Sequence, residues 1–241
     1  MGKAIVTGAT SGIGRAVALM LKAAGHEVLA IGRNAAALAD LAALGITPLQ
    51  LDLGSAEGIA EALAGHETDI LVNNAGMVSP PGNFCDMQAS DILRTVATNL
   101  TSALLVSHAI TPGMRARGRG HVFFTGSIAG HTPYPNMAVY AATKAALGGF
   151  AQSLRLDLSP SGVRVTEIVA GRVESPLYKD VLSLEARAAM YAGQNAVQPE
   201  DVASMVMAVL NMPPHVDVAR FDILPTRQPV AAVVPAAEKK Q

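Results

Sequence analysis

The chain has 241 residues, of which 50% are hydrophobic, 15% charged and 4% aromatic. This length suits one domain with a well-buried core, and the high hydrophobic content excludes intrinsic disorder for most of the chain. A formal net charge of −1 argues against a nucleic-acid-binding surface, which needs clustered Lys and Arg. The single cysteine, Cys85, excludes an internal disulfide and a zinc site built from several cysteines.

The compartment is predicted from the apolar segments. The run at residues 4–7 is too short for the central region of a signal peptide, and no stretch of about eighteen uninterrupted apolar residues follows. We therefore expect a cytoplasmic protein with no membrane span. The small number of charges predicts that apolar surface is buried between subunits, and two helical segments poor in charge, 91–114 and 137–158, favour a homodimer or homotetramer.

Short β-branched runs alternate with longer Ala- and Leu-rich segments along the whole chain. Strands are predicted at residues 3–7, 27–31, 47–51, 69–73, 121–125, 163–169 and 218–224. Helices are predicted at residues 14–24, 35–43, 56–63, 91–114, 137–158 and 199–211, with Ser55, Ser90 and Gln198 near three of their starts.

This alternation predicts right-handed βαβ units and an α/β fold. We expect one Rossmann-like, doubly wound domain over residues 1–241, with a mostly parallel seven-stranded sheet and helices on both faces. The strand runs are mostly continuous and apolar, as expected for strands covered on both faces. Residues 230–241 are expected to form a flexible tail. Segments 77–89 and 172–197 resist assignment, and both follow strands, where loops form the ligand crevice of such a sheet.

A glycine-rich turn, residues 7–14, links the first strand to the first helix. Small residues allow the backbone to approach a pyrophosphate, and the helix N-terminus offers free N–H groups with a partial positive charge. Its position at the first turn favours a dinucleotide site over an ordinary turn. The predicted contacts of the cofactor phosphates are Gly8, Thr10, Ser11, Gly12, Ile13 and Gly14.

The end of the second strand predicts NADP(H) as the cofactor. An NAD site presents a carboxylate to the ribose hydroxyls at this point, but here Gly32 and Arg33 follow the strand. An arginine can bind a 2′-phosphate with forked hydrogen bonds, although it could also be a solvated residue at a helix start. Asn34 and Leu53 are predicted beside the cofactor. Asp52 either accepts a hydrogen bond from the adenine amino group or caps the next helix.

Tyr140 and Lys144 form a candidate catalytic pair. Lys144 is the only charged residue between positions 136 and 154, and Tyr140 lies one helical turn before it on the same face. A cation beside a phenol lowers the pKa of the phenol toward the working pH, which suits a general acid/base for a carbonyl/alcohol pair. The pair could also be an exposed lysine near a core tyrosine. Ser127, just past the fifth strand, could hydrogen-bond the reacting oxygen.

Together these features resemble the short-chain dehydrogenase/reductase family. The resemblance rests on residues 7–14, the Asn73-Asn74-Ala75-Gly76 element, Ser127, and Tyr140 and Lys144. It implies that Tyr140 is the proton donor and acceptor, that Lys144 lowers its pKa and holds the nicotinamide ribose, and that Ser127 orients the substrate oxygen.

Further roles follow from the same resemblance. Asn99 matches a helix asparagine that supports a proton relay to the lysine, although it could instead bend its helix. Asn73 and Asn74 brace the sheet, and Asn74, Ala75 and Gly76 pass beside the cofactor ribose.

The sequence departs from the family after the sixth strand. The family commonly has Pro-Gly followed by Thr, whereas here Ala170-Gly171 is followed by Ser175. Gly171, Val173 and Ser175 are still predicted beside the cofactor. Arg172 either binds an acidic substrate or forms a surface ion pair with Glu174.

Within the family, the chain resembles NADP-dependent 3-hydroxy acid (serine-type) dehydrogenases. The resemblance rests on Pro133-Tyr134, residues 162–166 and 198–202, and the ending at residues 214–217 and 224–226. A small-molecule carbonyl or alcohol substrate is expected, and no nucleic acid or membrane partner. The predicted pocket wall is Met77, His131, Tyr134, Tyr178, Met190 and Tyr191.

Other functions remain open at this point. A 3-oxoacyl thioester, a simple ketone or a polyol is an alternative substrate. A nucleotide-binding regulator without catalysis is an alternative of another class, although the catalytic residue types are all present. No metal site is predicted, because the six histidines lack ligand-type spacing.

Overall fold

Seven parallel strands form one sheet in the computed structural model, which describes residues 1–132, 134–193 and 196–227. Their order across the sheet is β3-β2-β1-β4-β5-β6-β7. The strands are β1 Lys3–Thr7, β2 Glu27–Gly32, β3 Thr47–Gln50, β4 Ile70–Asn73, β5 Gly120–Thr125, β6 Val163–Ala170 and β7 Arg220–Ile223. Every described pair is parallel, which confirms the predicted doubly wound α/β fold. Pro133 and the predicted tail at 230–241 lie outside the described residues.

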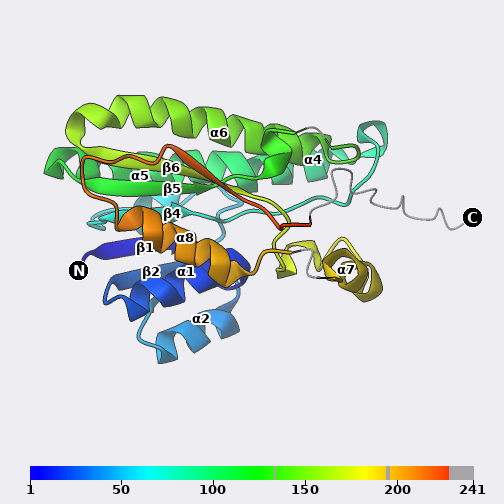
Figure 1. Cartoon of the computed structure of the whole chain (residues 1–241), viewed down its shortest axis with the longest axis horizontal. Helices are drawn as coiled ribbons and strands as arrows, with labels where there is room; N and C mark the ends of the chain where they lie inside the picture. Colours follow the sequence, from blue (N-terminus) through cyan, green and yellow to red (C-terminus); the bar gives the residue numbers. More distant parts are fainter. Residues whose placement is uncertain (133, 194–195, 228–241) are drawn as a thin grey trace, which may run out of the picture.

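Helices cover both faces of the sheet (Figure 1). One face carries α1 Gly12–Ala23, α2 Ala35–Ala43 and α8 Pro199–Leu210, and the other carries α3 Ile59–Leu63, α5 Ser102–Arg117 and α6 Ala138–Leu158. Helix α4 Ala89–Val96 precedes α5, and α7 Leu184–Tyr191 lies apart from both layers. The strand order reverses direction between β1 and β4, which is where ligands bind in open sheets of this kind.

The strands alternate their side chains between two apolar cores. In β1, Ala4 and Val6 pack under α1, α2 and α8, whereas Ile5 packs under α3, α5 and α6. Phe123 and Phe124 of β5 divide between the cores in the same way. Both layers are needed to bury such continuous apolar strands. Strand β3 differs, because it lies at the sheet edge and is mostly exposed.

Two predicted helices depart from the structure by more than two residues at an end or by an interruption. The segment 91–114 is not one regular helix: a π-helical turn, Ala97–Thr101, separates α4 from α5, and Gln88 rather than Ser90 precedes α4. Helix α3 starts at Ile59 instead of residue 56, because Gly58 has a left-handed backbone with φ of 78° that no helix continues through. The predicted start at Gln198 is confirmed, where Asp201 Oδ2 accepts a hydrogen bond from the Gln198 N–H at 2.8 Å.

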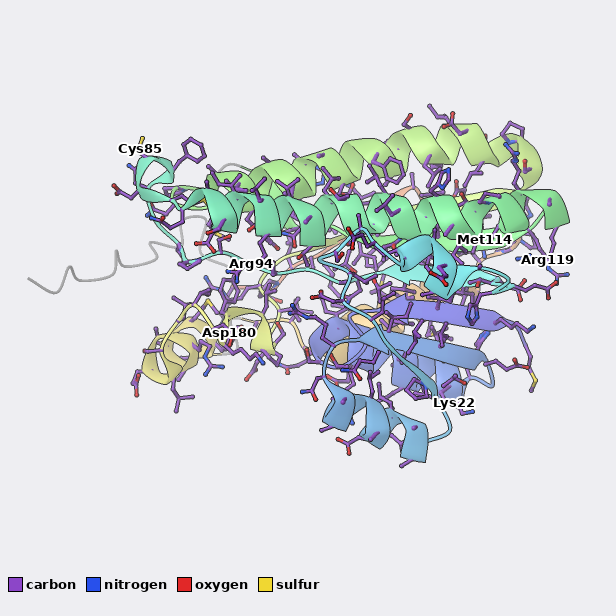
Figure 2. All side chains as sticks on the ribbon, turned by 180° about the vertical axis from the view of Figure 1, so that it is seen from behind. Lys22, Cys85, Arg94, Met114, Arg119 and Asp180 are labelled. Atoms are coloured by element: carbon purple, nitrogen blue, oxygen red, sulfur yellow. The ribbon has the colours of Figure 1, made fainter. Side chains whose placement is uncertain are left out.

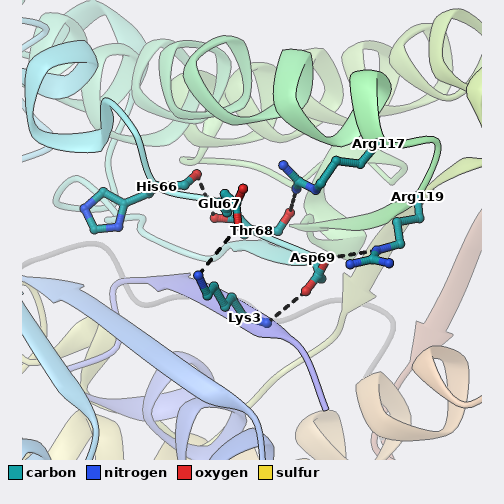
Figure 3. A network of polar contacts seen from close by, with 7 residues as sticks. All are labelled: Lys3, His66, Glu67, Thr68, Asp69, Arg117 and Arg119. Atoms are coloured by element: carbon teal, nitrogen blue, oxygen red, sulfur yellow. Dashed lines mark hydrogen bonds and ion pairs between the residues drawn. The ribbon is translucent and has the colours of Figure 1, made fainter.

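The amino-terminal edge of the sheet is held by polar contacts (Figure 3). Asp69 accepts hydrogen bonds from the Lys3 backbone N–H at 3.0 Å and from Arg119 Nε at 3.4 Å. Arg117 Nη2 donates to the Thr68 carbonyl at 2.6 Å, and Lys3 Nζ pairs with Glu67 at 3.7 Å. These contacts tie the starts of β1, β4 and β5 together at the edge opposite the strand ends where a ligand is expected.

Two leucines are exposed on the helices expected at a subunit interface. Leu93 on α4 is 71% exposed and Leu156 on α6 is 63% exposed. The oligomer remains a prediction. Within the described part of the chain, no helix combines the length and the apolar character that crossing a membrane requires.

Candidate active site

A cleft of about 850 Å³ lies at the carboxyl ends of the strands. It is lined by the glycine-rich turn, the ends of β2 to β6, and parts of the two segments that resisted assignment. Arg94 on α4 and Asp180 on the opposite segment line it from two sides (Figure 2). Residues 172–197 are not one open loop, because they include α7 and a parallel bridge between Val173 and Val197. The cleft is where the sequence predicted a ligand crevice.

The glycine-rich turn leaves the N-terminus of α1 open toward the cleft. Gly8 and Gly12 have left-handed backbones, with φ of 64° and 52°. Ser11 precedes the helix without capping it through its side chain, so helix N–H groups stay available to an anion. A Cβ on Gly14 would lie 2.4 Å from the Gly8 carbonyl oxygen, so Gly14 packs the helix against the turn and does not line the cleft.

The end of β2 offers a cation and has no room for an acid. A Cβ on Gly32 would lie 2.5 Å from Thr10 Cγ2, so a side chain there would have to displace the side chain of Thr10. Arg33 lines the cleft, and its side chain is 72% exposed. Asn34 lines the cleft and also caps α2, accepting a hydrogen bond from the Ala37 N–H at 3.1 Å.

Asp52 does not cap a helix, because α3 starts seven residues later, at Ile59. Its Oδ1 accepts a hydrogen bond from the Gly54 N–H at 2.9 Å and lies 3.9 Å from Arg33 Nη1. Leu53 lines the cleft beside it. Of the two roles predicted for Asp52, only the one toward the adenine stays open.

Asn74 joins three strand ends beneath the cleft. Its backbone N–H donates to Thr7 Oγ1 at 2.9 Å, its Nδ2 donates to the Thr7 carbonyl at 3.1 Å, and its Oδ1 accepts from Thr125 Oγ1 at 3.2 Å. β1, β4 and β5 are thereby held in register at the site. Asn73 instead donates to Ser107 Oγ at 3.0 Å inside the core. Ala75 and Gly76 continue along the cleft wall.

Ser127, Tyr140 and Lys144 lie together in the cleft, each less than a tenth exposed. Ser127 follows β5 and hydrogen-bonds with Tyr140. Tyr140 and Lys144 lie one turn apart on α6, and Lys144 Nζ is 5.8 Å from the centre of the tyrosine ring. Lys144 Nζ also donates to the Thr125 carbonyl at 2.7 Å. Lys144 is therefore buried and fixed, and the open alternative of an exposed lysine is excluded.

The electrostatics differ from the expected lowering of the tyrosine pKa. Burial raises the pKa of Tyr140, and the hydrogen bond with Ser127 acts in the opposite direction. Burial also lowers the pKa of Lys144 to about 8, opposed by the charge of Glu167. Burial is the larger of the two effects on the Tyr140 pKa, so Tyr140 keeps its proton near neutral pH.

Asn99 lies in the π-helical turn and uses its whole amide. Its Oδ1 accepts from the Met77 N–H at 2.8 Å, and its Nδ2 donates to the Met77 carbonyl at 2.9 Å and to Thr143 Oγ1 at 3.2 Å. Asn99 thus joins the segment after β4 to α6, where its partner Thr143 directly precedes Lys144. It does not line the cleft, although a Cβ on the neighbouring Gly76 would lie 3.5 Å from its Oδ1 and 3.7 Å from Lys144 Nζ.

The segment after β6 closes one side of the cleft. Gly171, Arg172, Val173 and Ser175 line it, and Ser175 faces the turn, since a Cβ on Gly12 would lie 3.1 Å from Ser175 Cβ. Arg172 donates to the Met190 carbonyl at 3.0 Å. Glu174 accepts a hydrogen bond from Gln198 instead of pairing with Arg172. Arg172 thus lines the cleft with its guanidinium at the carbonyl of Met190, which also lines it.

Four of the six residues predicted for the pocket wall line the cleft. Met77, Tyr134, Tyr178 and Met190 line the cleft, and Tyr178 interacts electrostatically with both Tyr140 and Arg172. Tyr191 does not line it, because its hydroxyl donates to the Ser175 carbonyl at 3.2 Å.

His131 is also not part of the lining, because its Nε2 lies 2.9 Å from Glu167 Oε1. The sequence did not predict Arg94 or Glu167 as residues at or near the site. For Glu167 the available signal was an acid within an apolar strand.

The comparisons with known proteins agree with this geometry. The family model described as short chain dehydrogenase matches residues 2–186. The uncharacterized short-chain type dehydrogenase/reductase y4eK of Sinorhizobium fredii is 43% identical over 94% of this chain and 92% of its own length. Sulfoacetaldehyde reductase of Chromohalobacter salexigens is 34% identical over 92% of this chain and 93% of its own.

A solved structure of the closed form of serine dehydrogenase complexed with NADP+ is similar over the whole fold. Its TM-score is 0.91 at 32% identity, and the match covers 97% of this chain and 99% of that one. The predicted resemblance to serine-type dehydrogenases is therefore confirmed. The family match, the relatives and the sheet topology lead to one conclusion: the chain belongs to the short-chain dehydrogenase/reductase family.

Proposed function

We propose that this chain is an NADP(H)-dependent oxidoreductase that interconverts a short anionic 3-oxo acid and its 3-hydroxy acid. The observation that carries the proposal is the buried group of Ser127, Tyr140 and Lys144 at one end of a cleft whose other end holds the glycine-rich turn and Arg33. The family membership supports the oxidoreductase class, and the serine dehydrogenase complex with NADP+ supports the cofactor.

The cleft fits such a cofactor on its own features. The open N-terminus of α1 suits a pyrophosphate, and the exposed Arg33 beside a position too crowded for an acid suits a 2′-phosphate. Asn74, Ala75, Gly76, Lys144, Gly171, Val173 and Ser175 are proposed to hold the rest of it. When bound, NADP(H) supplies or accepts the hydride.

The protein's part in the reaction is proton transfer and orientation. Ser127 and Tyr140 hydrogen-bond the carbonyl oxygen, and Tyr140 donates its proton as negative charge develops on that oxygen. The Lys144 ammonium stabilises the phenolate that remains. In the reverse direction the phenolate takes the proton of the alcohol. Asn99 holds Met77 and α6 in place around this group.

Arg33→Ala is expected to raise the KM for NADPH by about 10- to 100-fold, because it removes a charge-assisted hydrogen bond to the 2′-phosphate. The KM for NADH should remain nearly unchanged. Initial rates with the two cofactors measure this. Arg115→Ala, at the far end of α5, is the matched control. Equal losses with both cofactors in Arg33→Ala would contradict a 2′-phosphate contact.

The substrate class is supported by Arg172, which lies in the cleft and interacts with Tyr178, the neighbour of Tyr140. Its guanidinium suits a carboxylate attached near the carbonyl. Arg172→Met is expected to raise the KM for a short 3-oxo acid by about 10- to 100-fold while neutral ketones change little. Arg220→Met, paired with Asp222 on β7, is the control. Equal losses for acids and neutral ketones would assign Arg172 to folding of its segment.

A second candidate, reduction of longer 3-oxoacyl thioesters, is favoured by one observation. A smaller pocket of about 320 Å³ adjoins Tyr140 and is lined by residues 78–84, 86–88, 91 and 136–140, including Pro80, Phe84 and Met87. Such a pocket suits an acyl chain that extends beyond the main cleft.

Rates with NADPH against acetoacetate, sulfoacetaldehyde, an acetoacetyl thioester and butanone separate the two candidates. We expect the two free anions to have the highest kcat/KM.

A further inference from the structure

Glu167 is a buried acid that the proposed reaction does not use. It lies in β6 among apolar neighbours, and its side chain is 1% exposed. A buried carboxylate is costly unless hydrogen bonds and opposite charge compensate it. A buried acid so close to the active site is therefore expected to contribute to the function of that site.

Two glycines make room for this carboxylate. A Cβ on Gly126 would lie 2.6 Å from Glu167 Oε1, and a Cβ on Gly148 would lie 2.9 Å from the same atom. Gly126 directly precedes Ser127, and Gly148 lies one helical turn beyond Lys144 on α6. The carboxylate is thus packed against the two backbone segments that carry Ser127, Tyr140 and Lys144.

His131 provides the hydrogen-bonding partner. Its Nε2 lies 2.9 Å from Glu167 Oε1, and it directly follows the short helix Ile128–Gly130 that begins after Ser127. Gly130 presses on α6, since a Cβ there would lie 2.8 Å from the backbone carbon of Lys144. The turn that carries Ser127 therefore packs against Glu167 at Gly126 and is hydrogen-bonded to it at His131, and Gly130 packs against the backbone of Lys144.

The charge of Glu167 also acts on Lys144. The titratable groups around the lysine are Tyr140 on the same helix, Glu167 on β6 and His131 on the turn. Burial lowers the pKa of Lys144, and the negative charge of Glu167 opposes that effect. Removing this charge favours loss of the lysine proton.

We propose that Glu167 and His131 form a positioning pair, in which the buried carboxylate fixes the Ser127 turn and places a negative charge against α6, one helical turn beyond Lys144. This inference rests on the proposed function for its catalytic meaning. It assigns no contact with substrate or cofactor to either residue.

The first test observes Lys144 without turnover. The chain has six lysines, so carbon NMR of lysine labelled at the ε carbon can follow each one, with Lys144 assigned by its absence in Lys144→Met. In Glu167→Gln the titration midpoint of Lys144 is expected to fall by about one pH unit, as loss of a nearby opposite charge predicts. Glu174→Gln is the matched control, because Glu174 contacts Gln198 away from the lysine. An unchanged midpoint in Glu167→Gln would overturn the proposal.

The second test separates charge from hydrogen bonding in kinetics. Glu167→Gln is expected to lose about fivefold in kcat for carbonyl reduction at pH 8 and almost nothing at pH 6, because a lysine pKa that falls from about 8 to about 7 cuts the protonated fraction at pH 8 by about that factor. Glu167→Asp should restore the lysine midpoint. His131→Gln should lower kcat at both pH values without moving that midpoint, because the charge of Glu167 remains.

These outcomes also separate the pair from the proposed function. A wild-type chain that reduces no carbonyl would refute the proposed function, while the lysine titration would still test the pair. Wild-type kinetics in His131→Gln would refute the role of the histidine. If Glu167→Gln does not fold, the lysine midpoint in Glu167→Ala decides: a value lowered by about one unit supports the pair, and a value as in the wild type contradicts it.

Discussion

Replacing Tyr140 by phenylalanine is expected to lower kcat for carbonyl reduction by about 10³-fold, within the range that one positioned general acid contributes. The phenol is the buried hydroxyl that hydrogen-bonds with Ser127, and burial raises its pKa, so it holds the proton that the reduced oxygen needs. The ring remains in Tyr140→Phe, so packing should change little. Steady-state rates with NADPH and a short 3-oxo acid measure the loss.

NADPH binding is the control for this variant. Fluorescence titration should give a similar Kd for the wild type and for Tyr140→Phe, because the proposed phosphate contacts lie at the glycine-rich turn. Tyr191→Phe should keep nearly full kcat, because Tyr191 does not line the cleft and its hydroxyl contacts only the backbone carbonyl of Ser175. A Tyr140→Phe protein with more than a tenth of the wild-type kcat would exclude the tyrosine as the proton donor.

Lys144→Met is expected to lower kcat/KM for reduction by about 10²- to 10³-fold, because it removes the cation beside the phenol and a contact proposed for the nicotinamide ribose. The pH dependence gives a second readout. Burial lowers the pKa of Lys144 to about 8, so the ammonium is present below that pH and is lost above it. Reduction should therefore slow as the pH rises through about 8.

The variant Lys144→Arg tests the origin of this pH dependence. Arginine keeps its charge throughout the accessible range, so the decline above pH 8 should flatten even though the longer side chain lowers kcat. Tyr140 keeps its proton there, since burial raises its pKa. A decline that persists unchanged in Lys144→Arg would assign the titration to another group.

Much of the fold could be predicted from residue patterns alone. Continuous apolar runs mark strands such as β5 and β6, because both faces of a parallel sheet are buried. The π-helical turn at Ala97–Thr101 could not be predicted, because it depends on the Asn99 amide meeting the backbone of Met77, which lies 22 positions earlier. The late start of α3 depends on the backbone of one glycine, Gly58.

The site could be predicted where it depends on the spacing of residues along one helix. It could not be predicted where it depends on how deeply a side chain is buried. Tyr140 and Lys144 share a helix face, so their meeting follows from a separation of four residues. The direction of the tyrosine pKa depends on how deeply the ring is buried, which spacing does not reveal. His131 was predicted in the pocket wall, but a loop residue can point either way, and the buried Glu167 draws it away from the cleft.

Transfer of the hydride can be followed directly with a labelled cofactor. The purified chain is mixed with a short 3-oxo acid and NADPH carrying deuterium at the hydride-donating carbon, and the alcohol is analysed by mass spectrometry. We predict one deuterium in the product, formed much faster than with labelled NADH and nearly absent with Tyr140→Phe. An NADH preference would contradict the role of Arg33. NADPH binding with no deuterium transfer to acetoacetate, sulfoacetaldehyde, an acetoacetyl thioester or butanone would contradict catalysis and favour a regulatory nucleotide-binding protein.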